Sequence, residues 1–86
     1  MFSHIMLGAN DVQKSKTFYD AILGALGYEP GVIDDKGRCF YITKAGIFCI
    51  SKPINGEPAC RGNGSTIGFS AENPELADAW HAAGIA

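Results

Sequence analysis

A strand followed by a capped helix occurs twice in the chain, 62 residues apart, and this repeat constrains the fold more than any other feature. Ile5 aligns with Ile67 in the two strand patterns, and Asp11 aligns with Asn73 where each helix begins. Both Asp and Asn are favourable helix N-caps. A fixed period indicates that one structural unit is used twice. Any two strand–helix units share such features, so a coincidental match stays open.

The spacing of the repeat divides the 86 residues unevenly. One unit takes about 62 residues, so two complete units need about 124. We therefore predict an α+β fold, with a complete βαβββ module over residues 1–62 and the first strand and helix of a second module over residues 63–86. The expected strands are 4–8, 28–33, 38–44, 47–52 and 65–71, and the expected helices are 12–26 and 74–83.

The first helix is predicted from an apolar stripe at helical spacing, and Gly27 is well placed to end it. The stripe consists of Val12, Tyr19, Ile22, Leu23 and Leu26. It predicts the side of this helix that packs on the sheet.

The cysteine pattern is typical of a reducing compartment, because the chain has three cysteines and no C-x-x-C spacing. A two-residue hairpin turn at 45–46 would place Ile42 opposite Cys49. Side chains alternate between faces along a strand, so Cys39 and Cys49 would then lie on opposite faces of the sheet. We expect free thiols.

Charge and hydropathy exclude several classes of protein. The net charge is -2, which argues against a nucleic-acid binder. No apolar run approaches the roughly 18 residues of a membrane span. The first residues carry no basic segment followed by an apolar one, so we expect no signal peptide and a cytoplasmic location.

Two segments resemble the glyoxalase/bleomycin-resistance/dioxygenase superfamily, whose members are also called vicinal oxygen chelate proteins. Residues 11–24 have the sequence DVQKSKTFYDAILG, which is similar to that family's first-helix signature. Residues 62–69, GNGSTIGF, resemble the start of its second module. The resemblance covers the whole chain and implies two βαβββ modules that enclose a cavity, in agreement with the repeat.

The resemblance also implies a divalent metal, such as zinc, nickel or iron, with two ligands from each module. His4 matches the first ligand position, and Cys49 is the approximate counterpart of the second. The third position is usually His, but this chain has Thr66. A threonine hydroxyl is a poor substitute for imidazole or carboxylate, and an apolar strand would raise the pKa of Cys49. His4 is therefore the one ligand that we expect.

Strand alternation predicts which side chains face the cavity. In the hairpin, Phe40, Ile42, Cys49 and Ser51 share one face, and in the first strand His4 and Met6 face away from the helix. The resemblance places Thr66 of the fifth strand on the cavity side. The expected pocket residues are His4, Met6, Phe40, Ile42, Cys49, Ser51, Thr66 and Gly68. An alternative is that the apolar members are simply core.

Two functions follow from the resemblance. The first is a glyoxalase-like enzyme related to lactoylglutathione lyase, or a dioxygenase, acting on a small molecule in the cavity. The second is a metal-free small-molecule binding protein, like the drug-sequestering bleomycin-resistance members. No catalytic residue is assigned. Because one module leaves an apolar face and free strand edges exposed, we also expect a homodimer.

Overall fold

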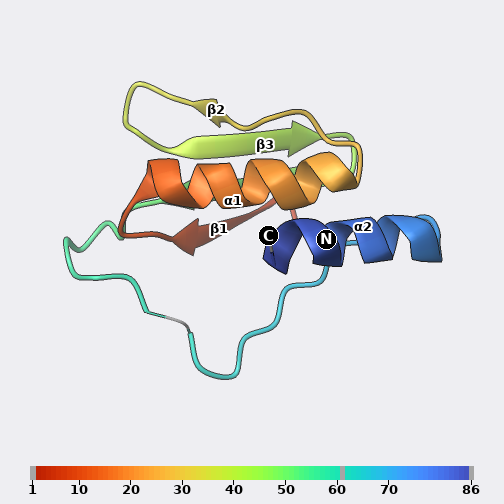
Figure 1. The fold of residues 1–86 in the computed structure, drawn as a ribbon. Helices are drawn as coiled ribbons and strands as arrows, with labels where there is room; N and C mark the ends of the chain where they lie inside the picture. The colour runs from red at the N-terminus through yellow and green to blue at the C-terminus, as the bar shows by residue number, and fades with distance from the viewer. Residues whose placement is uncertain (1, 61, 86) are drawn as a thin grey trace.

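Four strands and two helices are formed by residues 2–60 and 62–85, which the computed structural model describes (Figure 1). The fold is α+β, as predicted. The elements are β1 (His4–Gly8), α1 (Val12–Ala25), β2 (Val32–Ile33), β3 (Cys39–Thr43), β4 (Gly46–Ser51) and α2 (Pro74–Ile85). Neither helix in the described ranges is long and apolar enough to cross a membrane. A cytoplasmic location and a module boundary at residues 62 and 63 stay predictions.

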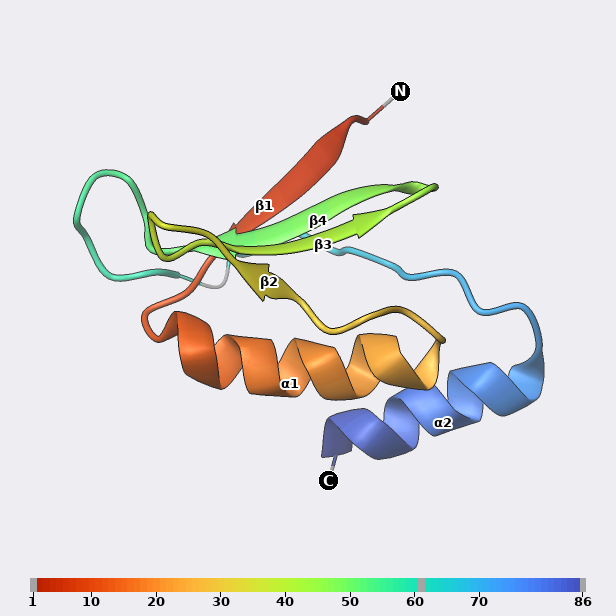
Figure 2. The same cartoon turned by 90° about the horizontal axis from the view of Figure 1, so that it is seen from above.

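The strands form one sheet in the order β1-β4-β3-β2. β2, β3 and β4 are antiparallel neighbours, whereas β1 runs parallel to β4, with His4 paired to Ile47. Both helices lie on the same side of this sheet, and α2 packs alongside α1 (Figure 2). The arrangement is a complete βαβββ module followed by the helix of the next unit.

Helix α1 begins and ends where the sequence predicts. The Asp11 side chain accepts a hydrogen bond from the backbone N–H of Lys14 at 3.1 Å. Gly27 follows the helix with a φ of 96°, a left-handed conformation that glycine adopts without strain. Of the predicted stripe, Ile22 and Leu23 are each 3% exposed.

The hydrophobic core lies between α1 and the sheet. Ile22 and Leu23 of the helix belong to one cluster with Tyr41, Phe48 and Ile50 of β3 and β4. Fully burying a side chain of this size stabilises a fold by roughly 1.5–3 kcal/mol. These side chains fill most of the space between α1 and the sheet.

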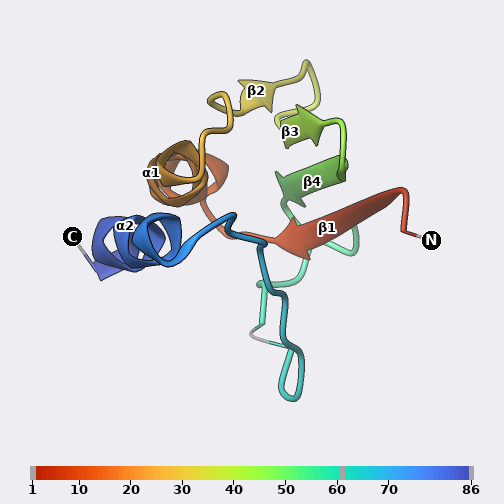
Figure 3. The same cartoon turned by 90° about the vertical axis from the view of Figure 1, so that its right-hand side faces the viewer.

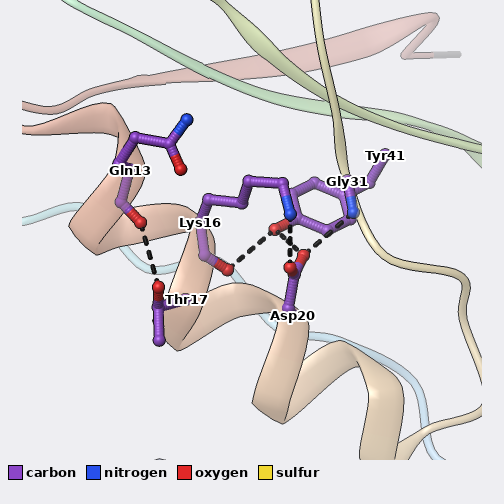
Figure 4. A network of polar contacts seen from close by, with 6 residues as sticks. All are labelled: Gln13, Lys16, Thr17, Asp20, Gly31 and Tyr41. Carbon is purple, nitrogen blue, oxygen red and sulfur yellow. Dashed lines mark hydrogen bonds and ion pairs between the residues drawn. The ribbon is translucent and has the colours of Figure 1, made fainter.

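A polar contact around Asp20 holds α1 to the sheet and to the segment before β2 (Figure 4). One carboxylate oxygen accepts hydrogen bonds from the Tyr41 hydroxyl at 2.7 Å and from the Gly31 N–H at 2.9 Å. The other oxygen binds the Lys16 ammonium at 2.6 Å. Burial alone would raise the pKa of Asp20, but these three hydrogen bonds outweigh it and hold that pKa below its ordinary value.

Gly31 can carry no side chain in this arrangement. A Cβ atom there would lie 2.5 Å from the Cys39 sulfur and 2.7 Å from Cζ of Tyr41. The backbone therefore approaches β3 closely, and its N–H donates to Asp20 instead of to a strand. Pro30 has no N–H to donate. For these reasons β2 is only two residues long, shorter than the predicted strand 28–33.

The predicted register of the hairpin is wrong by two residues. Ile42 lies opposite Ile47, and Phe40 lies opposite Cys49, so the turn falls at 44–45 rather than at 45–46. The Thr43 hydroxyl accepts hydrogen bonds from the backbone N–H groups of Ala45, at 3.1 Å, and Gly46, at 3.2 Å. It also donates to the Gly46 carbonyl at 2.8 Å. A shift of two leaves every side chain on its predicted face.

The predicted strand at 65–71 is also wrong. This segment has no sheet partner among the described residues, and its backbone hydrogen bond, from the Ser65 N–H to the Gly62 carbonyl at 2.9 Å, closes a turn. Phe69 nevertheless packs edge-on against Phe48, with ring centroids 5.4 Å apart. The helix that follows forms as expected, with Asn73 as its N-cap.

Asp20→Asn is expected to make the free energy of unfolding less dependent on pH in the acid range. A carboxyl group whose pKa is lowered by folding stabilises the protein fully above its unfolded pKa, about 3.9. This contribution is lost as the pH falls through the lower folded pKa. The amide keeps an acceptor for Tyr41 and Gly31 but has no charge. Urea melts between about pH 7 and pH 2 should show a smaller loss of unfolding free energy for the variant than for the wild type.

Lys14→Gln, an exposed change on the same helix, should keep the wild-type pH dependence. Desolvation would raise the pKa of Asp34, but hydrogen bonds from Arg38 hold it below its ordinary value. Asp34 therefore keeps the unfolding free energy of Asp20→Asn partly dependent on pH. Identical slopes in the wild type and in Asp20→Asn would contradict the described network.

Candidate functional site

One face of the sheet is covered by neither helix (Figure 3). Strand register places on it the side chains that alternate with the buried, helix-facing ones. We call this surface the open face; its residues are His4, Met6, Gly8, Val32, Arg38, Phe40, Ile42, Ile47, Cys49 and Ser51. Ile42 is 73% exposed and Val32 66% exposed, which is unusual for large apolar side chains on a central sheet.

The centre of the open face is tightly packed. Cys49 is fully buried between its neighbours, and its thiol donates a hydrogen bond to the Ile5 carbonyl at 3.4 Å. The Ser51 hydroxyl lies 3.3 Å from the sulfur of Met6 and donates to the Lys52 carbonyl at 3.1 Å. The centre of this face is therefore apolar, because the polar groups of Cys49 and Ser51 are bonded to backbone carbonyls.

Cys49 is poorly suited to act as a nucleophile or a metal ligand. Burial raises the pKa of its thiol, and the nearby positive charge of Arg38 does not offset that effect. Thiolate, not thiol, is the reactive and ligating form. At neutral pH Cys49 is therefore a small apolar group.

The other expected ligands do not come together with it. His4 is exposed at the start of β1, and its Nδ1 is 2.8 Å from the Ser3 hydroxyl. Thr66 is exposed in the segment that forms no strand. Among the described residues no three His, Cys, Asp or Glu side chains are grouped so as to hold a metal ion. Within residues 2–60 and 62–85, His4, Cys49 and Thr66 therefore do not form the metal site that the resemblance implies.

The structure brings most of the predicted pocket residues together. His4, Met6, Phe40, Ile42, Cys49 and Ser51 share the open face. Gly68 lies apart from most of them: it lines a hollow of about 440 Å³ on the helix side of the sheet, together with Tyr41 and Phe48. Of the predicted pocket residues named above, His4 also lines that hollow. Because one wall of that hollow is the unpaired segment 67–70, we assign it no function.

Four open-face residues are not among the predicted pocket residues: Gly8, Val32, Arg38 and Ile47. Arg38 is the charged one. Its guanidinium lies over the Phe40 ring, 5.2 Å from the centroid, and pairs with Asp34 at 2.6 Å. A signal was present, since residues 38, 40 and 42 alternate onto one face. Residue 38 is the first residue of the predicted strand 38–44, so strand alternation places its side chain on the same face as those of Phe40 and Ile42.

The βαβββ module, with one sheet face left uncovered opposite the helices, is the module that the resemblance implies. A glyoxalase/bleomycin resistance protein from Albidiferax ferrireducens T118 matches 99% of this chain with 60% sequence identity and a TM-score of 0.94. The match covers 68% of that relative's length. The chain belongs to the glyoxalase/bleomycin resistance protein family. No family model and no curated protein matches it.

The rate of alkylation should distinguish the exposed thiol from the two buried ones. Cys60 is exposed, whereas Cys39 and Cys49 are buried, and burial raises the pKa of both of the latter. With iodoacetamide at neutral pH, peptide mapping should show Cys60 modified on the order of a hundredfold faster than the other two. Urea should abolish the difference. In Cys60→Ser the native chain should stay unmodified; rapid labelling of Cys49 in that variant would mean that the centre of the open face is not packed as described.

Proposed function

We propose that the chain binds an apolar or aromatic small molecule on the open face, without a metal ion. The observation that supports this most directly is the exposure of Met6, Val32 and Ile42 on the sheet face opposite the helices. Ligand sites are typically apolar surfaces with a few polar groups that orient the ligand. The open face has this composition.

The individual side chains suit such a role. Phe40 offers an aromatic surface, and Met6 supplies a flexible, polarizable thioether that adapts to irregular shapes. Ile42 and Ile47 extend the apolar area toward the hairpin. Since Cys49 is a neutral thiol bonded to backbone, we assign it to packing beneath the ligand and not to chemistry.

A glyoxalase-like enzyme is the second candidate. The observation that favours it is the exposed imidazole of His4, which stands on the open face where the resemblance places the first metal ligand. Further ligands would have to come from outside the described residues. This candidate therefore makes a different prediction about metal content.

The open face also needs a cover, and we propose that a second copy of the chain provides it. β1 pairs on one side only, with β4, so its other edge presents free backbone groups. A two-fold dimer that joins the exposed apolar side chains of two copies closes a cavity between them. Additional chain, as in the longer relative, is the alternative cover.

Binding of the neutral dye N-phenylnaphthylamine tests the proposed function. The dye should bind the purified chain with a rise in fluorescence, and Ile42→Ser should weaken binding several-fold, because about 1 kcal/mol or more of apolar contact is lost. Ile85→Ser is the matched control, since Ile85 is 75% exposed at the end of α2, away from the open face. That variant should bind like the wild type.

Chelation separates the two candidates. Treatment with EDTA should leave dye affinity unchanged. Binding that needs about one zinc, nickel or iron ion per chain, lost on His4→Ala, would favour the enzyme instead. Equal loss of affinity in Ile42→Ser and Ile85→Ser would remove the open face as the binding surface.

Sedimentation tests the proposed dimer. At micromolar concentration the 86-residue chain should sediment as a dimer, and Ile42→Asp should shift it toward monomer, because a charge would be buried between the two copies. Ile85→Asp is the control and should leave the dimer intact. A compact, cooperatively folding wild-type monomer would contradict the proposal.

A further inference from the structure

We propose that the ligand of the open face carries an anionic group, such as a carboxylate or sulfonate, which Arg38 binds at the end of the face opposite the hairpin. This inference rests on the proposed function, because it adds a charged end to the same apolar site. Four features of the described residues support it.

The first feature is the position of the guanidinium. Arg38 directly precedes β3 and alternates with buried Cys39, so its side chain emerges on the open face. Extending the hairpin register places it opposite Ser51. Its contact with the Phe40 ring confirms that side, since Phe40 lies on the same face.

The second feature is pre-organisation. One carboxylate oxygen of Asp34 accepts a hydrogen bond from Nε of Arg38 at 2.7 Å and forms an ion pair with Nη2 at 2.6 Å. Its other oxygen accepts the backbone N–H groups of Arg38 and Lys36, at 2.8 and 3.0 Å. The side chain is thus fixed before any ligand arrives, which lowers the entropic cost of binding.

The third feature is the donor capacity that remains. Both contacts with Asp34 use the Nε and Nη2 groups, and Nη1 has no hydrogen-bond partner within residues 2–60 and 62–85. The side chain is 38% exposed. Guanidinium N–H groups form strong, charge-assisted bonds with carboxylate and related anions.

The fourth feature is a hollow of about 790 Å³ beside Arg38. Lys36 and Lys52 line it as well, against one acidic lining residue, Asp11, while the whole chain has a net charge of -2. The first turn of α1 also borders it, and the Asp11 carboxylate caps that turn by accepting the Lys14 N–H. With the Asp34 that pairs with Arg38 included, three cationic side chains stand against two acidic ones here, so this region is weakly positive although the whole chain is negative.

These features combine into one ligand class. The apolar body would lie on Phe40, Met6 and Ile42, and the anionic group would reach Arg38 and the neighbouring hollow. Ser51, which lines both the hollow and the open face, stands where the two parts meet.

Two dyes that share one aromatic skeleton provide the test. Anilinonaphthalene sulfonate carries a sulfonate, and N-phenylnaphthylamine is its neutral counterpart. The wild type should bind the sulfonate dye more tightly. Arg38→Gln should lower its affinity on the order of tenfold, the effect of losing one charge-assisted contact, and should change the affinity for the neutral dye less than about twofold.

Two further variants keep the test decisive. Asp34→Asn retains one acceptor for the backbone N–H groups of the turn but replaces the oxygen that fixes Arg38 by an NH2 group, so the sulfonate dye should bind several-fold less tightly and the neutral dye equally well. A turn that merely unfolded would weaken both dyes. Lys44→Gln removes a positive charge at the hairpin end and should change neither affinity.

The outcomes separate this inference from the proposed function. If the neutral dye binds but Arg38→Gln leaves the sulfonate dye unaffected, or weakens both dyes equally, Arg38 is not the anion site and the apolar site stands. If neither dye binds the wild type, the proposed function itself is overturned.

Discussion

The carboxylate of Asp20 is the interaction on which the arrangement of the site depends. It receives hydrogen bonds from the central strand β3 through Tyr41 and from the chain before β2 through Gly31. Because these bonds fix α1 against one side of the sheet, the apolar stripe of the helix covers that side alone. The other side is left to present a surface instead of a second core layer. Uncovering one face is thus a direct result of how the helix is attached.

Helix α1, the faces of the hairpin and the fold class could be predicted from the sequence, because the patterns that define them are local. The cap at Asp11, the apolar stripe and Gly27 define α1 within one residue of its observed end. The faces of the hairpin were correct although its register was not, since alternation depends on whether a shift is odd or even. Cys49 and Phe40 therefore remained on the predicted surface, and the fold class followed from the repeat.

The remainder depends on contacts that a sequence pattern does not contain. Residues 65–71 alternate like a strand, but a strand also requires a partner edge, and none lies beside them in the described residues. The role proposed for Arg38 depends on a turn that brings the Asp34 carboxylate within 2.6 Å of its guanidinium. It also depends on the Phe40 ring, over which the guanidinium lies. Thr66 was placed by the resemblance, and the segment around it follows the helix side of the sheet.

The parallel pairing of β1 with β4 has a consequence for folding kinetics. β3 and β4 meet through a tight turn, whereas His4 must find Ile47 across about half the chain. Closing a long loop is slow, so we expect the hairpin and α1 to form before β1 docks at the edge. The open face spans β1, β3 and β4 and is complete only after that last step. A small molecule bound across these three strands, as proposed above, would therefore be expected to slow unfolding by retaining β1 and to leave the refolding rate unchanged.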